Sequence, residues 1–215
     1  MKTSAANAKP FYDISEYCAK VSEVLSRIPS PDIELVIQAL IETHEAGGTV
    51  FLFGNGGSAA LASHMACDLG KGMADVTPRR SRVLSLTDNV ALITAWANDI
   101  GYEAVFSEQL NNYLRPGDVA FAISGSGNSP NVLRALSVAR SLGATTVGLT
   151  GFEGGKAKEL CDLSIVVPSD NMQIIEDVHT ILAHGMFSVL RTRMRLSPPM
   201  GAHLGTLRST TASAD

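Results

Sequence analysis

The feature that most constrains the fold of this chain is a regular alternation of short apolar runs with segments of helical periodicity. Two helical patterns come first, at residues 12–27 and 31–46, and the alternation begins at Thr49. Five β-rich runs span residues 49–53, 82–86, 119–123, 145–149 and 163–167, and helical patterns span 59–69, 89–97, 105–114, 131–142 and 172–193. Strands that alternate with helices form a parallel sheet, because each return to the same end of the sheet needs a crossover. The sequence therefore predicts an α/β protein: a parallel β-sheet flanked by helices on both faces, in a flavodoxin-like three-layer sandwich with N-terminal helices.

Chain length and composition fit one domain. With 215 residues, of which 45% are hydrophobic and 18% charged, the chain can bury a substantial core. We expect a single domain over residues 11–195. A flexible N-terminus at 1–10 and a mobile Ser/Thr/Ala-rich tail at 196–215 are expected to flank it.

Charge, hydropathy and cysteine content argue against several classes of protein. The net charge of −4 and the pI near 5.7 disfavour nucleic-acid binding. No apolar run approaches the roughly 20 residues that span a bilayer, and residues 1–10 lack the apolar segment of a signal peptide. The three cysteines are scattered and form no CxxC motif. We expect a cytoplasmic protein that binds neither nucleic acid nor membrane.

A serine-rich loop joins the apolar run 119–123 to the helical pattern 131–142. Its sequence is Ser-Gly-Ser-Gly-Asn-Ser-Pro over residues 124–130. Ser129 is a suitable N-cap, and Pro130 suits the first helical position, where its missing N–H is not needed. Hydroxyls and backbone amides gathered at a helix N-terminus bind anions. The loop therefore predicts a site for a phosphorylated small molecule.

A glycine-rich loop occupies the equivalent place after the run 49–53, with the sequence Gly-Asn-Gly-Gly-Ser over residues 54–58. It is not a dinucleotide fingerprint, because Ala59 stands at the third glycine position. It is either a tight turn that needs glycine or a second ligand loop, in which Ser58 can cap the helix that follows. The carboxyl ends of parallel strands share one edge, where ligands of open α/β sheets bind. Both loops are predicted at that edge.

Two groups of ionisable residues form a candidate metal and acid–base site. His64 and Asp68 are spaced i, i+4 and share a helix face, so they are either half of a divalent-metal site or an ordinary surface pair. The last helical pattern adds Glu176, Asp177, His179 and His184. Glu176 and His184 are separated by about 12 Å of helical rise. They reach one metal only if their side chains converge, the helix is irregular or different subunits contribute, and the spacing does not choose between the two histidines.

Taken together, these motifs resemble the sugar isomerase (SIS) domain superfamily and, within it, the phosphoheptose isomerases. The glycine loop with His64 is similar to the first sugar-phosphate loop and metal-binding helix of that family. Asn98 and Asp99 resemble its substrate-contacting Asn-Asp pair. The three serines of the serine loop match its phosphate-binding serines, and residues 175–179 followed by His184 resemble its C-terminal motif.

The resemblance implies an activity and a set of site residues. The implied reaction converts sedoheptulose 7-phosphate to D-glycero-D-manno-heptose 7-phosphate through an enediol, in a homotetramer with active sites between subunits. Asp68 would act as base with His184 as its acid–base partner. One zinc, or another divalent metal, per subunit would be bound by His64, Asp68, Glu176 and His184. The implied substrate-binding residues are Asn55, Gly56, Gly57, Ser58, Asn98, Asp99, Ser124, Gly125, Ser126, Ser129 and Glu176.

The chain departs from the family pattern at three positions. Asp68 stands in place of Glu, Glu176 in place of Gln, and Gly125 in place of a hydroxyl residue. These changes leave related sugar phosphates open as substrates. The main alternative is a non-catalytic SIS protein, either a sugar-phosphate sensor or an initiator-associating regulator. Such a protein needs the phosphate loops but has no need of the metal and acid–base residues.

Overall fold

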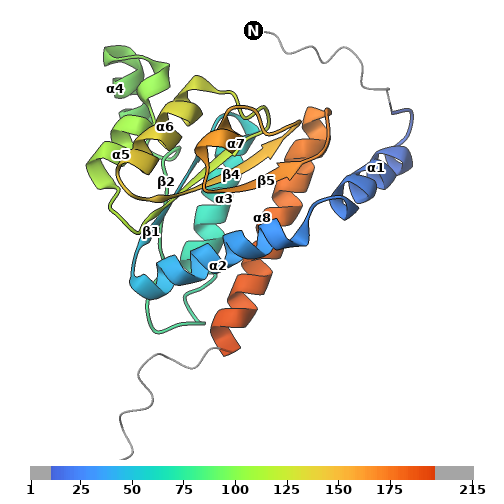
Figure 1. Cartoon of the computed structure of the whole chain (residues 1–215), viewed down its shortest axis with the longest axis horizontal. Helices are drawn as coiled ribbons and strands as arrows, with labels where there is room; N and C mark the ends of the chain where they lie inside the picture. Colours follow the sequence, from blue (N-terminus) through green and yellow to red (C-terminus); the bar gives the residue numbers. More distant parts are fainter. Residues whose placement is uncertain (1–10, 197–215) are drawn as a thin grey trace, which may run out of the picture.

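The computed structural model describes residues 11–196, which contain the predicted parallel sheet. Five parallel strands lie in the order β2-β1-β3-β4-β5 (Figure 1). Their bounds are Thr49–Gly54 for β1, Arg82–Ser85 for β2, Val119–Ser124 for β3, Thr145–Gly151 for β4 and Leu163–Val167 for β5. This is the flavodoxin-like strand order, so the predicted fold class is confirmed. The predicted terminal segments 1–10 and 196–215 lie outside the described residues, apart from Leu196.

The helices follow the predicted pattern with two additions. Their bounds are Ile14–Ser26 for α1, Ser30–Ala46 for α2, Gly57–Lys71 for α3, Val90–Asp99 for α4, Ser107–Tyr113 for α5, Pro130–Ser141 for α6, Ala157–Leu160 for α7 and Met172–Leu196 for α8. A 3₁₀ turn, η1, spans Tyr102–Ala104. Neither α7 nor η1 was expected, because three or four residues are too few to show a helical period.

Of the two predicted helix caps, the one at Ser58 is wrong and the one at Ser129 is confirmed in position. Helix α3 begins at Gly57, so Ser58 lies inside its first turn and is not the cap. Gly56 takes the N-cap position with a φ of 57°, a left-handed conformation that favours glycine. Ser129 does occupy the N-cap of α6 and Pro130 its first position, but the Ser129 hydroxyl makes no capping hydrogen bond. That hydroxyl is consequently available to a ligand.

Alternate residues of each strand face opposite layers. In β1, Val50 and Leu52 join the core formed with α2, α3 and α8, while Phe51 and Phe53 join the core beneath α5 and α6. Helix α1 packs on α8 at the outside of the first layer (Figure 1). The Tyr17 hydroxyl fixes it there by donating to Asp177 Oδ2 at 2.5 Å.

The centre of the sheet is the point where the chain changes direction. From β1 the chain crosses to the β2 edge, whereas from β3 it proceeds through β4 to β5 at the other edge. The loops after β1 and β3 therefore emerge side by side at the carboxyl ends of neighbouring strands. Ligands of open α/β folds bind at this kind of switch point. Within residues 11–196, no helix combines the length and apolar character needed to cross a membrane.

Candidate active site

The serine loop is folded by its own hydroxyls. Ser124 is buried at the end of β3, and its Oγ accepts a hydrogen bond from the Gly127 amide at 3.2 Å. The Ser126 Oγ accepts from the Asn128 amide at 3.2 Å. The Ser126 hydroxyl hydrogen and the whole Ser129 hydroxyl have no partner among the described residues. The loop is thus preformed while still offering donors to an anion.

A second segment, which follows β4, braces the serine loop from behind. The Ala157 amide donates to the Gly127 carbonyl at 2.9 Å, and the Lys156 amide donates to Asn128 Oδ1 at 3.1 Å. Gly127 has a φ of 63°, and a Cβ on this residue would lie 2.0 Å from the Gly154 carbonyl oxygen. Two backbones therefore approach each other at a distance that only glycine permits.

Replacing Gly127 with alanine should disrupt the backbone contact between Gly127 and Gly154. The added methyl would meet the Gly154 backbone and would also occupy a left-handed conformation, so we expect Gly127→Ala to lower the free energy of unfolding by about 2 kcal/mol or more. Urea denaturation would measure the change. Gly70→Ala is the matched control, because a Cβ there meets nothing within 4 Å. Equal stability of the two variants would contradict the proposed contact.

Gly125, which stands where the family pattern has a hydroxyl residue, lies against the side chain of Met172. A Cβ on Gly125 would lie 2.5 Å from Met172 Sδ, at the first residue of α8. The Gly125 carbonyl accepts a hydrogen bond from the Gly151 amide at 2.9 Å. The space that a hydroxyl side chain would need at residue 125 is therefore filled by the Met172 thioether.

The glycine loop is connected to the serine loop through side-chain amides. Asn55 Nδ2 donates to Asn131 Oδ1 at 2.9 Å, and Asn131 belongs to the first turn of α6. The Tyr102 hydroxyl also donates to Asn55 Oδ1, at 3.0 Å. Neither Asn131 nor Tyr102 was predicted as a site residue. An asparagine two residues after the last serine of the loop is the signal in the sequence that could have indicated Asn131.

The predicted pair Asn98 and Asp99 lies at the end of α4. Both residues are exposed, and Asn98 Nδ2 donates to Asp99 Oδ1 at 2.8 Å. Among the described residues, neither side chain forms a hydrogen bond to either loop. Their position as substrate contacts remains a prediction.

A cluster of two histidines and a carboxylate joins α3 to α8. His64 Nε2 lies 2.9 Å from His184 Nε2 and 3.3 Å from Asp68 Oδ2, and His184 Nε2 lies 4.0 Å from the same oxygen. Both imidazoles are about half exposed. The contact between the two Nε2 atoms requires one ring to carry a hydrogen on that nitrogen and the other to offer its lone pair. This cluster unites three of the four predicted metal ligands.

The three ligand atoms suit a divalent metal. They all lie within 4.8 Å of one another. Ligand atoms held about 2.0–2.1 Å from a tetrahedral zinc ion are about 3.3 Å apart, which is close to the observed separations. Imidazole nitrogen and carboxylate oxygen are also donors that zinc prefers. A three-residue set leaves a fourth position open, as in catalytic zinc sites.

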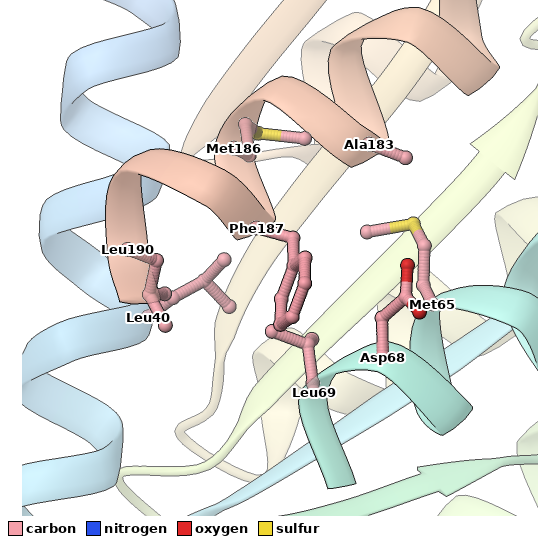
Figure 2. Close-up of a pocket in the computed structure, with 8 residues that line it drawn as sticks. All are labelled: Leu40, Met65, Asp68, Leu69, Ala183, Met186, Phe187 and Leu190. Carbon is pink, nitrogen blue, oxygen red and sulfur yellow. The ribbon is translucent and has the colours of Figure 1, made fainter. Parts of the chain in front are cut away.

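Packing between α2, α3 and α8 holds this cluster in register (Figure 2). Phe187, one turn beyond His184 on α8, lies over α3 close to Leu69. A Cβ on Gly72 would be 2.5 Å from the Phe187 ring, so the ring sits directly on the end of α3. Asp68 borders the cavity of about 10 Å³ between these helices, which has room for about one water molecule.

Glu176 is not part of this cluster within one chain. Its carboxylate lies beside the glycine loop, where a Cβ on Gly57 would be 3.0 Å from Glu176 Oε2. It lines a cavity of about 220 Å³ together with Ser58 and Thr180. Helix α8 is continuous, so it carries Glu176 towards the loops and His184 towards Asp68. The geometry places Glu176 with the predicted substrate-binding residues of its own chain.

The structure distinguishes between the two histidines of α8. His179 is 1% exposed, and its Nε2 lies 3.0 Å from the Thr150 carbonyl in the core. Burial lowers the pKa of His179 from 6.5 to about 4, against the opposing effect of the hydrogen bond to Thr150. His179 is therefore a neutral core residue, whereas His184 lies in the cluster with His64 and Asp68.

The buried His179 should make stability fall in acid. Between pH 6.5 and about 4 the unfolded chain binds a proton at this residue and the folded chain does not, so lowering the pH favours unfolding. The free energy of unfolding should decrease between about pH 7 and about pH 4.5, and we expect His179→Gln to make this decrease smaller by on the order of 2 kcal/mol. Urea unfolding at both pH values would measure it. Parallel pH profiles for the two proteins would show that His179 is protonated in the fold.

Comparisons with known proteins identify the family of this chain. A family model described as SIS domain matches residues 16–151. A phosphoheptose isomerase from Aliarcobacter butzleri is 39% identical over 186 residues, which cover 86% of this chain and 96% of that protein. Another, from Akkermansia muciniphila, is 42% identical over 71% of this chain and 80% of its own length. The chain belongs to the phosphoheptose isomerases of the SIS domain family.

Structural similarity supports this assignment. The solved phosphoheptose isomerase GmhA from Neisseria gonorrhoeae matches with a TM-score of 0.77 at 28% identity, covering 83% of this chain and 97% of that one. The resemblance stated from the sequence motifs is thereby confirmed. As a phosphoheptose isomerase relative, the chain is an aldose–ketose isomerase. The alternative of a non-catalytic sensor or regulator is set aside.

Proposed function

We propose that this isomerase interconverts sedoheptulose 7-phosphate and D-glycero-D-manno-heptose 7-phosphate. The observation that carries the proposal is the combination of a preformed serine loop with the His64–Asp68–His184 cluster. The loop supplies hydroxyl and amide donors for a phosphate, and the cluster supplies a base and an imidazole for proton transfer. Relatives that are 39% and 42% identical to this chain are named phosphoheptose isomerase, which supports a phosphorylated heptose as substrate.

The reaction moves a carbonyl between C1 and C2 of the sugar. Starting from the ketose, Asp68 takes a proton from C1, and a proton returns to C2 on the way to the aldose. The C1 hydroxyl proton is lost and the C2 oxygen gains one, with His184 as acid–base partner. Asp68 Oδ2 faces the histidines, while Oδ1 has no protein partner among the described residues. Oδ1 is therefore the oxygen that would accept the carbon-bound proton.

His64, Asp68 and His184 would hold a zinc or another divalent ion, about one per subunit, and Glu176 would be a further ligand only from a different subunit. When bound, the ion would supply Lewis-acid polarisation of the sugar carbonyl. Glu176 in place of glutamine adds a second carboxylate to the neighbourhood and strengthens attraction for a cation. In its own chain Glu176 would contact the sugar beside Gly57 and Ser58.

We further propose a homotetramer with active sites between subunits. Asp68 lies eleven positions beyond Gly57 on α3, about 16 Å of helical rise away from the glycine loop. One sugar phosphate spans that distance poorly, so loops of one copy would face the cluster of another. Ile181 and Val189, exposed on α8 to 44% and 37%, flank His184 and fit such an interface. The three unpaired cysteines fit a reducing, cytoplasmic location.

Metal content tests the ligand assignment. Purified protein should carry about one divalent ion per chain, and His64→Ala or Asp68→Ala should lose most of it. Inductively coupled plasma mass spectrometry would measure the metal. Cys67→Ser and His179→Gln are the controls: the first changes an exposed residue between the two ligands of α3, and the second changes the buried histidine of α8. A full complement of metal in His64→Ala would reject this site.

Turnover of sedoheptulose 7-phosphate tests the reaction. NMR should detect the aldose product with the wild-type protein. We expect His184→Ala to slow turnover by at least about a hundredfold with the ligand still bound, because a proton carrier is removed. Ser126→Ala should raise KM about tenfold, since a phosphate donor is lost.

The control for these variants is Ser137→Ala, on the exposed face of α6. It should match the wild type in both KM and kcat. A wild-type protein that holds metal but does not turn over sedoheptulose 7-phosphate would redirect the assignment to another ketose phosphate. Full activity of His184→Ala would overturn the proposed mechanism.

A further inference from the structure

Asn131 forms a reciprocal side-chain amide pair with Asn55, which links the first turn of α6 to the glycine loop. It is 2% exposed, at the second position of α6. Asn131 Nδ2 donates to Asn55 Oδ1 at 2.8 Å while Asn55 Nδ2 donates back to Asn131 Oδ1 at 2.9 Å. Two buried or half-buried amides in this reciprocal arrangement satisfy each other at low cost.

A backbone amide decides which way this pair is oriented. The Val132 amide donates to Asn131 Oδ1 at 3.0 Å, and a backbone N–H can only donate. The oxygen of Asn131 is therefore fixed, so its Nδ2 must face an acceptor, which is Asn55 Oδ1. The Tyr102 hydroxyl also bonds to Asn55 Oδ1, at 3.0 Å. The orientation of Asn55 thus follows from the start of α6.

This orientation leaves Asn55 with a donor to spare. Its Oδ1 receives two hydrogen bonds, whereas its Nδ2 uses one of two hydrogens, and no other described residue accepts the second. Asn55 is half-buried at the mouth of the glycine loop, next to Gly56 and Gly57, which are exposed. A fixed N–H at this place can donate to an oxygen of a ligand.

We infer that Asn131 is a positioning residue for substrate binding. Asn131 holds the side-chain amide of Asn55 so that the free N–H of Asn55 faces an oxygen of the bound sugar phosphate. It also links the glycine loop to α6, the helix that follows the serine loop. This inference rests on the proposed function. Asn131 does not itself touch substrate; it acts through Asn55.

The test is a KM and kcat comparison with sedoheptulose 7-phosphate as the probe. Asn131→Leu, with Asn131→Ala as a second variant, should raise KM about tenfold while kcat changes less than about twofold, because a donor held for the bound sugar is lost in ground state and transition state alike. Val132→Ala is the matched control, because it removes buried volume from the adjacent residue but retains the amide pair. It should lower the melting temperature with KM unchanged.

A double-mutant cycle separates positioning from a general structural role. In the Asn55→Ala background, Asn131→Leu should cause no further rise in KM, because the residue through which it acts is absent. Additive effects, an unchanged KM, or a KM rise equal to that of Val132→Ala would overturn the inference. The inference would also be contradicted if both Asn131 variants failed to fold while Val132→Ala folded. It would be contradicted equally if the wild-type protein converted the sugar phosphate and Asn55→Ala retained the wild-type KM. A wild type that neither binds nor converts the probe would reject the proposed function, and this inference with it.

Discussion

The site depends on the parallel pairing of β1 with β3 at the centre of the sheet. In this register Gly54 lies opposite Ile123, so both strands end at the same level and their loops emerge together. The backbones are so close that a Cβ on Gly54 would be 2.5 Å from the Ile123 carbonyl oxygen. The crossovers leave β1 and β3 in opposite directions, so the two loops lie at a switch point of the kind at which open α/β folds bind ligands. The glycine and serine loops owe their proximity to this pairing.

A second constraint is the packing of α8 across α3. The 25-residue helix α8 runs without interruption from the glycine and serine loops to its contacts with α2. One continuous helix therefore carries two functions: Glu176 near the glycine loop, and His184 against His64 and Asp68. The Phe187 ring on Gly72 fixes the rotation of α8 that makes the second contact. The separation along α3 and α8 is also the physical reason to expect that subunits share active sites.

Much of the fold was predictable from the sequence because its local signals agree. The runs at 49–53 and 119–123 are rich in Val, Phe and Ile and are bounded by Gly and Ser, and β1 and β3 extend one residue beyond each prediction. The order of the strands was not readable in the same way, since it depends on the direction along the sheet in which each crossover places the next strand. The cap of α3 was predicted at Ser58, but Gly56 alone can adopt the left-handed φ there.

The site was predictable in part. His64 and Asp68 are spaced for one helix face, and the structure brings His184 to them. The choice between His179 and His184 required tertiary packing, because only the position of α8 on β4 decides which histidine is buried. Asn131 was missed for a similar reason: its partner Asn55 is 76 residues away. Short-range patterns identify which residues carry chemistry, whereas long-range packing decides which of them meet.

We propose that the serine loop holds the phosphate of the substrate while Asp68 and His184 face its reacting carbons. This placement is tested by a crystal structure of the His184→Ala variant with sedoheptulose 7-phosphate bound. We expect phosphate oxygens within hydrogen-bonding distance of the Ser126 and Ser129 hydroxyls, and C1 and C2 beside Asp68 of a neighbouring subunit. A phosphate bound away from residues 124–130, or a C1 and C2 out of reach of every Asp68, would contradict it.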